Sequence, residues 1–166
     1  IKKDELFFAV KGPNFDGNDY ASEALNKGAS AAIIDNPDIS NKQKILVSNA
    51  KSALGELARL WKNKLSSQII AVTGSNGKTT LKEILGNCLS INHKTFSTKG
   101  NFNNDIGLPL MILEINNSYE FAVLEMGANK EHEIEHLVEI ASPDIVVINN
   151  AALAHLDGFI NIDGVA

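Results

Sequence analysis

The feature that most constrains the fold is a nine-residue stretch, residues 72–80, which reads VTGSNGKTT. An apolar run at residues 69–73 leads into it, and a segment with helical periodicity at residues 78–90 follows its glycines. A strand, a glycine loop and a helix in this order form the usual context of a phosphate-binding loop, in which backbone N–H groups and a helix N-terminus face an anion. The stretch therefore predicts an α/β fold in which the loop lies at the end of a buried strand.

The loop departs from the general phosphate-loop pattern, G-x-x-x-x-G-K-[ST], at one position. Counting back from Gly77, the first glycine of the pattern falls on Val72. Gly74 and Gly77 allow a tight turn. Lys78 can reach the β and γ phosphates of a nucleotide, and the Thr79 hydroxyl can coordinate Mg²⁺. The alternative is a strand–turn–helix whose glycines serve only the turn, which leaves Lys78 and the paired threonines unexplained.

Short apolar runs alternate with segments of helical periodicity along the chain, which predicts parallel sheets covered by helices on both faces. The pattern restarts after the pair Ser66 and Ser67, so we expect two domains, residues 1–66 and 67–166. Strands are predicted at residues 6–10, 31–34, 45–47, 69–73, 95–97, 121–125 and 145–148, and those at 31–34 and 45–47 are expected to be buried. Helices are predicted at residues 20–27, 50–65, 78–90, 108–113 and 131–141.

Composition narrows the class of protein. The formal net charge is −5 and the lysines are scattered, so no basic patch indicates a nucleic-acid partner. Cys88 is the single cysteine, which fits a reducing compartment and allows no internal disulfide. No apolar run approaches the ~20 residues that a membrane span needs. We expect a cytoplasmic monomer and, because both ends of the sequence are abrupt, a fragment of a longer protein.

Beyond these patterns, the loop TGSNGKTT resembles the ATP loop of the Mur ligases and folylpolyglutamate synthetases. In that family an apolar residue ends the strand where an ordinary phosphate loop has its first glycine, so Val72 agrees with the narrower motif. The stretch LFFAVKGPNFDGNDY is similar to the family's uridine-nucleotide domain, where LFVALKG…DGHDF is typical. The stretches TKGNFNNDIGLPL, LEMGAN and NNAALAHLDGF are most similar to the member of the family that adds D-alanyl-D-alanine.

The resemblance implies a truncated N-terminal uridine-nucleotide-binding α/β domain followed by part of a P-loop parallel-sheet ATPase domain. The implied activity is an ATP-dependent amide ligase of peptidoglycan synthesis that joins D-alanyl-D-alanine to UDP-N-acetylmuramoyl-tripeptide through an acyl phosphate, with ATP and Mg²⁺. Another amide ligase of the same family and a P-loop nucleotide-binding module without ligase activity remain alternatives. Because segments that the family usually has are missing from both ends, the fragment itself is expected to be inactive.

The resemblance also implies which residues form the site. Lys78 would stabilise charge on the transferring phosphoryl group as the catalytic residue. The implied ATP-binding residues are Gly74, Ser75, Asn76, Gly77, Lys78, Thr79 and Thr80. The implied metal ligands are Thr79, Glu125 and His155. The implied substrate-binding residues are Asn14, Phe15, Asp16, Gly17, Asn101, Asn103, Asn104, Asp105 and Asn129.

The residues themselves leave plainer readings open for several of these positions. Glu125 ends a predicted strand at the carboxyl edge of a parallel sheet, where α/β sites gather, but a solvated glutamate can also end a strand. His155 follows the next strand, and because Mg²⁺ prefers oxygen ligands, a core or loop histidine is the alternative. The Asn- and Asp-rich stretches can also be ordinary turns, since these residues favour turns.

The sequence HEIEH at residues 132–136 matches the zinc-protease pattern H-E-x-x-H and provides a rival enzyme hypothesis. At ~100° per residue an apolar helix face formed by Ile134, Leu137, Val138 and Ala141 would bury one side of the helix. His132 and His136 would then point into solvent. We therefore expect a solvated helix face without zinc.

Overall fold

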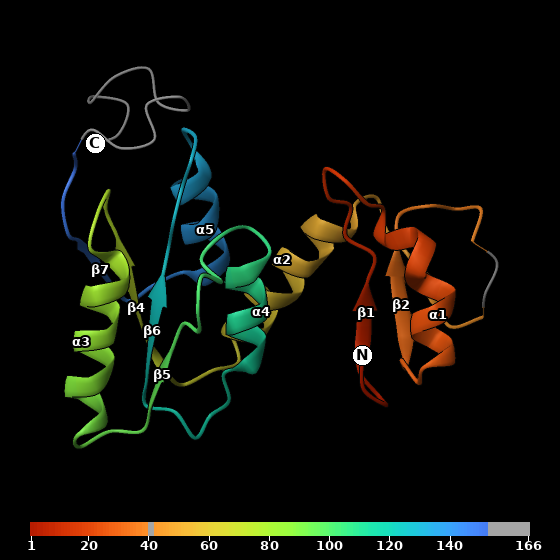
Figure 1. Cartoon of the computed structure of the whole chain (residues 1–166). Coiled ribbons are helices and arrows are strands. Elements are labelled where there is room, and N and C mark those ends of the chain that lie inside the picture. Colours follow the sequence, from red (N-terminus) through yellow and green to blue (C-terminus); the bar gives the residue numbers. More distant parts are fainter. Residues whose placement is uncertain (40–41, 153–166) are drawn as a thin grey trace. The chain divides into compact units, whose positions relative to one another are not determined.

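The computed structural model describes residues 1–39 and 42–152 and divides into two compact units, Ile1–Leu54 and Gly55–Ala166. Each unit has its own parallel β-sheet, and the parallel arrangement is as predicted (Figure 1). The first unit contains β1 (Leu6–Phe8), the 3₁₀ helix η1 (Gly17–Tyr20), α1 (Ala21–Asn26), β2 (Ala31–Ile34), β3 (Lys44–Leu46) and the start of α2 (Ala50–Lys62). The second contains the rest of α2, β4 (Gln68–Thr73), α3 (Lys78–Ser90), β5 (Thr95–Ser97), α4 (Gly107–Glu114), β6 (Phe121–Glu125), α5 (Glu133–Ala141) and β7 (Ile145–Ile148).

The sheet of the first unit has the order β1-β2-β3, with every described pair parallel. Ala21, Ala24 and Leu25 of α1 share a buried cluster with Ala32 and Ile34 of β2. Small side chains on the helix bring its backbone close to the sheet, and burial of the apolar surface stabilises this contact.

The prediction of a buried strand at residues 45–47 is wrong. The strand, β3, covers Lys44–Leu46, and the side chains of Ile45 and Leu46 are 50% and 52% exposed. β3 lies at the edge of the described sheet, where β2 shields only one side of it. An apolar run by itself does not distinguish an edge strand from a central strand.

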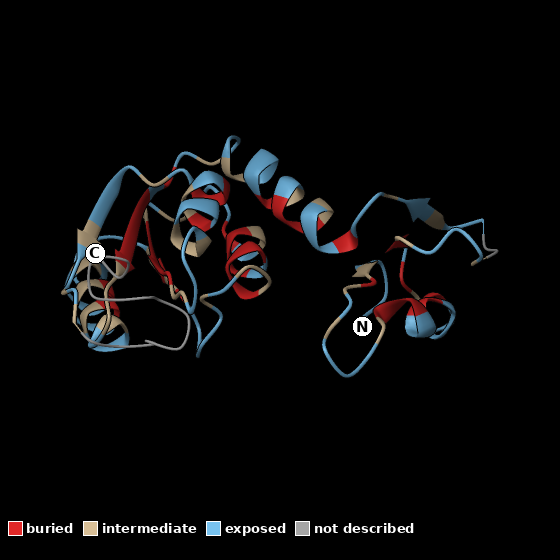
Figure 2. Cartoon of the chain, turned by 90° about the horizontal axis from the view of Figure 1, so that it is seen from above, coloured by how far each residue is buried: buried red, intermediate tan, exposed pale blue. Residues whose placement is uncertain are grey.

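The sheet of the second unit has the order β5-β6-β4-β7 and is parallel throughout. Alternate residues of a strand point to opposite faces, so β4 contributes to two cores. Ile70 and Val72 pack toward α3, whereas Ile69 and Ala71 join a cluster with residues of α4, α5 and α2. Helices therefore cover both faces of this sheet, as predicted. Figure 2 shows the buried residues concentrated in the strands and on the inner sides of the helices.

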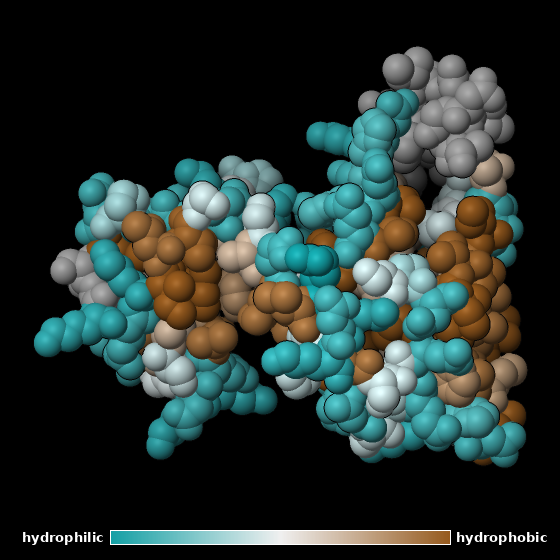
Figure 3. Space-filling model, turned by 180° about the vertical axis from the view of Figure 1, so that it is seen from behind, coloured by the Kyte–Doolittle hydropathy of each residue, from teal (hydrophilic) through white to brown (hydrophobic). Residues whose placement is uncertain are grey.

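The edge strand β7 exposes much of its apolar surface. Ile145, Val146 and Ile148 are 45%, 50% and 68% exposed. Apolar side chains gather along this edge of the second unit in the space-filling view (Figure 3). Within residues 1–39 and 42–152, no helix has both the length and the apolar character needed to cross a membrane.

Helix α2 contains the division between the two units. At its start, the Ala50 N–H donates to Asp35 Oδ2 of the first unit at 3.1 Å. Toward its end, Ala58 is buried in the core of the second unit, and the Trp61 Nε1–H donates to the carbonyl of Ile115 at 2.8 Å. The compact units therefore divide earlier in the chain than residue 66, because the last turns of the helix pack with the second core.

Candidate nucleotide and metal site

The glycine loop connects β4 to α3, as its sequence predicted. Gly74 and Gly77 have φ angles of 137° and 74°, a region that residues with a side chain rarely adopt. Gly77 also directly precedes α3, so the left-handed turn ends where the helix begins. A Cβ atom at Gly77 would lie 2.8 Å from Asn149 Nδ2. Both glycines are therefore required by the backbone conformation, and a side chain at Gly77 would in addition displace the Asn149 side chain.

Two asparagines that the sequence reasoning missed hold the loop from the adjacent strand. Asn149 and Asn150 follow β7, which pairs with β4. The Ser75 N–H donates to the Asn150 carbonyl at 3.0 Å, and the Asn76 N–H donates to Asn150 Oδ1 at 3.1 Å. Asn149 Nδ2 in turn donates to the Asn76 carbonyl at 2.7 Å. In the sequence, these asparagines appear only as two polar residues directly after an apolar run. Their role could not be predicted from this pattern, because it depends on β7 lying beside β4.

The reactive groups of the loop lie at the start of α3. Lys78 Nζ donates to the carbonyls of Gly74 at 2.6 Å and Ser75 at 3.2 Å, so its ammonium lies against the loop backbone. Thr79 and Thr80 are exposed. A lysine ammonium beside a helix N-terminus favours a bound anion, because the ammonium carries a positive charge and the helix N-terminus carries a partial positive charge.

Glu125 lies beside this loop at the end of β6. Glu125 pairs in register with Val72 of β4, which confirms the prediction that the two strands are neighbours. The side chain is 2% exposed, and Oε1 accepts a hydrogen bond from Asn103 Nδ2 at 2.7 Å. Within the described part of the chain, Oε2 is buried and has no hydrogen-bond partner. Buried polar atoms are normally satisfied, and a carboxylate oxygen is a preferred ligand of Mg²⁺, so this atom fits a bound divalent cation.

The asparagine-rich loop before α4 uses much of its polar surface internally. The Asn103 side chain binds Glu125, and its carbonyl accepts from the Gly127 N–H at 2.9 Å. Asn104 Oδ1 accepts from the N–H groups of Ile106 at 3.2 Å and Gly107 at 2.8 Å, at the beginning of α4. These two side chains therefore position the loop. Asn101, on the same loop, is exposed.

A cavity of about 280 Å³ lies beside this loop in the second unit. It brings together three of the predicted substrate-binding residues, Asn104, Asp105 and Asn129. Its lining residues are Asn104, Asp105, Gly127, Asn129, Glu131, His132, Glu133, His136 and Leu137. Most of these residues carry polar or charged side chains, which can form hydrogen bonds with a sugar or a peptide.

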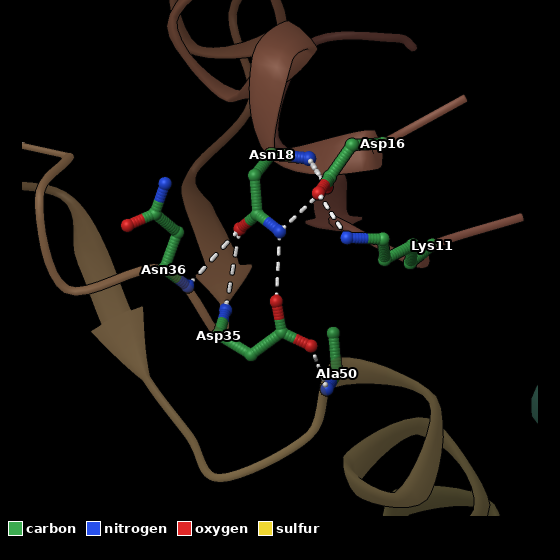
Figure 4. Close-up of polar contacts among 6 residues, drawn as sticks. All are labelled: Lys11, Asp16, Asn18, Asp35, Asn36 and Ala50. Atoms are coloured by element: carbon green, nitrogen blue, oxygen red, sulfur yellow. Dashed lines mark hydrogen bonds and ion pairs between the residues drawn. The ribbon is translucent and has the colours of Figure 1, made fainter.

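In the first unit, the loop predicted to bind uridine diphosphate is organised by its own polar groups (Figure 4). Asp16 Oδ1 accepts from Asn18 N at 2.9 Å and from Asn18 Nδ2 at 2.7 Å, and Asp16 Oδ2 lies 3.2 Å from Lys11 Nζ. Hydrogen bonds from Asn18, the backbone N–H first, together with Lys11 lower the pKa of Asp16. Asn14 and Phe15 are exposed, with Phe15 at 57%.

Asn18, which the sequence reasoning did not select, is the centre of this network. It is buried, and besides its bonds to Asp16 its Nδ2 donates to Asp35 Oδ1 at 2.7 Å. Its Oδ1 accepts from the N–H groups of Asp35 and Asn36, both at 3.3 Å. A Cβ atom at Gly17 would lie 2.6 Å from the Val10 carbonyl oxygen, so the close packing of this loop requires glycine there.

The histidines of HEIEH are exposed, as the helical wheel predicted, with side-chain exposures of 83% for His132 and 55% for His136. The helix begins later than predicted. His132 has φ 65° and is the N-cap residue of α5, and its carbonyl accepts a hydrogen bond from the His136 N–H at 3.1 Å. Each contacts a glutamate, with His132 Nδ1 at 3.0 Å from Glu135 and His136 Nδ1 at 3.9 Å from Glu139. His155, which the family resemblance implies as a metal ligand, lies outside the described residues.

Comparisons with known proteins place this geometry in a family. Residues 72–166 match the model of the Mur ligase middle domain, and residues 1–62 match the model described as the Mur ligase family, catalytic domain. The UDP-N-acetylmuramoyl-tripeptide--D-alanyl-D-alanine ligase of Haemophilus influenzae is 42% identical over 96% of this chain and 36% of its own length. The Escherichia coli enzyme of the same name is 40% identical over 97% and 36%. The chain thus spans about a third of the length of these curated relatives.

Solved structures give the same result. MurF ligase from Thermotoga maritima, in complex with ADP, matches with a TM-score of 0.93 and 41% identity over 99% of this chain and 39% of that one. MurF from Acinetobacter baumannii matches with a TM-score of 0.92 and 36% identity over 99% of this chain and 36% of that one. The fold predicted from the sequence is therefore that of known enzymes.

Proposed function

The chain belongs to the Mur ligase family, and on that premise we propose that the whole protein joins D-alanyl-D-alanine to UDP-N-acetylmuramoyl-tripeptide in peptidoglycan synthesis. The names and similarity of the curated relatives support this substrate pair. Within the molecule, the observation that carries the proposal is the buried Glu125 carboxylate oxygen, which has no hydrogen-bond partner among the described residues and lies beside the loop formed by Gly74 and Gly77. We further propose a cytoplasmic monomer.

In the proposed reaction, the carboxylate of the tripeptide attacks the γ-phosphorus of ATP and becomes an acyl phosphate, with ADP as the leaving group. The amine of D-alanyl-D-alanine then attacks the acyl carbon, and phosphate leaves as the amide bond forms. The glycine loop, residues 74–80, would bind the triphosphate through its N–H groups. Lys78 would leave the carbonyls of Gly74 and Ser75 and stabilise the charge on the transferring phosphoryl group.

Thr79 and Glu125 would hold Mg²⁺, which supplies charge neutralisation at the phosphates when it is bound. His155 is proposed as a ligand of a second magnesium from the family resemblance alone.

For the substrate, residues 1–66 are proposed as the uridine-nucleotide domain, with Asn14, Phe15, Asp16 and Gly17 at the uridine diphosphate. The cavity residues Asn104, Asp105 and Asn129, with Asn101 and Asn103 of the same loop, are proposed to face the muramoyl-peptide part. Residues 67–166 form part of the proposed ATP-binding domain, and the two matched segments, which end at 62 and begin at 72, support a boundary between them.

The test is an assay of the full-length protein with ATP, Mg²⁺, UDP-N-acetylmuramoyl-tripeptide and D-alanyl-D-alanine, in which phosphate release is measured as each is omitted in turn. We expect release only when all are present, with UDP-N-acetylmuramoyl-pentapeptide detected by mass spectrometry. Product formation with a different amino acid in place of the dipeptide would instead indicate another ligase of the family. Nucleotide binding without any product would favour a P-loop binding module.

A further inference from the structure

Lys82 is a buried lysine that the proposed reaction does not use. It lies on α3, one helical turn after Lys78, and its side chain is 1% exposed. A buried ammonium group loses its hydration at a large cost in free energy unless hydrogen bonds compensate for the loss. A lysine at this depth is therefore expected to hold a specific partner.

The partners of Lys82 connect α3 to the strand beside it. Its Nζ donates to the Thr98 carbonyl at 2.9 Å and lies 2.5 Å from Glu83 Oε1. The Glu83 side chain is 59% exposed and so faces water, whereas Thr98 is 2% exposed. The buried end of the interaction is thus the backbone of Thr98, directly after β5.

Thr98 in turn fixes the end of β6. Its N–H donates to the Val123 carbonyl at 3.0 Å, and its Oγ1 accepts from the Glu125 N–H at 2.9 Å. The loop that begins at Thr98 returns to the same strand, where Asn103 binds the Glu125 carboxylate. Glu125 is therefore held at its backbone by Thr98 and at its side chain by Asn103, and Lys82 anchors Thr98.

We propose that Lys82 is a positioning residue that links the nucleotide-loop helix to the Glu125 carboxylate through Thr98. Lys78 and Lys82 then have separate tasks on one helix: Lys78 meets the phosphate, and Lys82 keeps the metal-ligand carboxylate in place relative to the loop. This inference rests on the proposed metal-dependent nucleotide site. Groups that orient a metal ligand without touching the metal typically change metal affinity by about 10- to 100-fold.

The test compares Lys82→Met, which keeps the length of the side chain and removes the charge and the hydrogen bonds, with two controls in the full-length protein. Glu83→Gln removes the charge of the exposed partner, and Ile115→Val removes one buried methylene from the core as a measure of general destabilisation. Hydrogen exchange of the peptide that contains Glu125 and Gly127 is measured without nucleotide, and ADP binding is measured by calorimetry over a range of Mg²⁺ concentrations.

Lys82→Met should accelerate exchange at Glu125 and Gly127 more than Ile115→Val does, and should raise the Mg²⁺ concentration for half-maximal ADP binding by about 10-fold. Both controls should leave the Mg²⁺ dependence unchanged. If Lys82→Met merely lowers the melting temperature as Ile115→Val does, with the same exchange at Glu125 and the same Mg²⁺ dependence, the proposal is wrong.

A second pair of variants applies if Lys82→Met does not fold. Thr98→Val removes the hydroxyl that accepts from Glu125, whereas Thr98→Ser keeps it. Only Thr98→Val should accelerate exchange at Glu125 and weaken Mg²⁺-dependent binding, and equal behaviour of the two variants would overturn the link. The absence of ligase product from the unaltered protein would refute the proposed function alone, because exchange at Glu125 is measured without any substrate.

Discussion

The loop around Asn18 in the first unit and the glycine loop beside Glu125 in the second both follow parallel strands, but they use their polar groups differently. The Asn18 side chain makes four hydrogen bonds, to Asp16, Asp35 and Asn36. Glu125, which is also buried, has one oxygen bonded to Asn103 and one without a partner in the described residues. A satisfied buried group stabilises the fold, whereas an unsatisfied one costs free energy until a ligand binds. The comparison therefore distinguishes the Asn18 network, whose hydrogen bonds stabilise the fold, from Glu125, whose second oxygen suits a ligand-binding site.

The largest expected effect is at Lys78, the cation of the glycine loop. Lys78→Ala in the full-length protein should lower turnover on the order of 100- to 1,000-fold, because a preorganised charge at the transferring group is lost. Its stability should change little, since Lys78 Nζ bonds only backbone carbonyls of a half-exposed loop in the described structure. The measurements are phosphate release and circular dichroism, with Lys64→Ala at an exposed position as the control. Near-normal turnover with an unchanged spectrum would refute the phosphate-loop assignment.

The next largest effect is expected at Glu125, where a substitution should weaken Mg²⁺-dependent binding without lowering the free energy of unfolding. Glu125→Gln keeps the shape and an acceptor for Asn103 but removes the charge, so the Mg²⁺ concentration needed for ADP binding should rise by at least about 10-fold. Without metal, the free energy of unfolding should be unchanged or higher, because a buried charge is replaced by a neutral group. Calorimetry and denaturant unfolding followed by Trp61 fluorescence measure the two effects, with Glu139→Gln on the exposed side of α5 as the control. Strong destabilisation with unchanged metal dependence would make Glu125 a structural residue.

Asn18 should behave in the opposite way. Asn18→Ala removes all four side-chain hydrogen bonds and leaves partly buried partners unsatisfied, which should destabilise the first unit by about 1–2 kcal/mol. Hydrogen exchange of peptides from residues 16–20 and 31–36 measures this loss, and Asn26→Ala at an exposed helix position is the matched control. Trp61, the single tryptophan, packs in the second unit, so its fluorescence transition should change much less. Wild-type protection of the first unit would show that the Asn18 network contributes little.

Most of the strands and helices were predictable because they depend on local patterns. Short apolar runs, helical spacing and the glycines gave the order of elements and the strand–loop–helix at residues 68–90, and helix ends differed by a few residues. The burial of β3 was predicted wrongly, because the position of a strand within a sheet is not encoded in its own residues. The sequence was equally silent on η1, whose turn depends on the Asp16 side chain accepting from the Asn18 N–H.

Within the candidate site, the sequence predicts roles for residues that have a chemical signature, but it gives no sign of several residues that position them. Gly77, Lys78 and Glu125 stand in a recognisable motif or at a strand end. Asn150 acts on the glycine loop across 74 positions of sequence, and Lys82 reaches Thr98 across 16. These contacts exist only once β7 lies beside β4 and α3 lies over β5. A lysine on an amphipathic helix is ordinarily exposed, so nothing local marks Lys82 as buried.

The smallest expected effect is on the pH dependence of the stability of the first unit, through Asp16. Hydrogen bonds from Asn18, with Lys11 nearby, hold the pKa of Asp16 below its ordinary value of 3.8 in the folded first unit. A carboxyl group whose pKa is depressed by folding binds its proton more weakly in the folded state than in the unfolded chain. Its contribution to stability is therefore fully present above pH 3.8 and is lost as the pH falls through the lower folded pKa.

Asp16→Asn should destabilise the first unit modestly at neutral pH, and its difference from wild type should shrink as the pH falls below 3.8. Asp19→Asn, at an exposed position in the same 3₁₀ helix, is the control and should leave the pH profile unchanged. The measurement is hydrogen exchange of residues 11–20 at a series of pH values, corrected for the intrinsic exchange rate. A difference between Asp16→Asn and wild type that stays constant across this range would mean that the Asp16 charge is not part of what holds the loop.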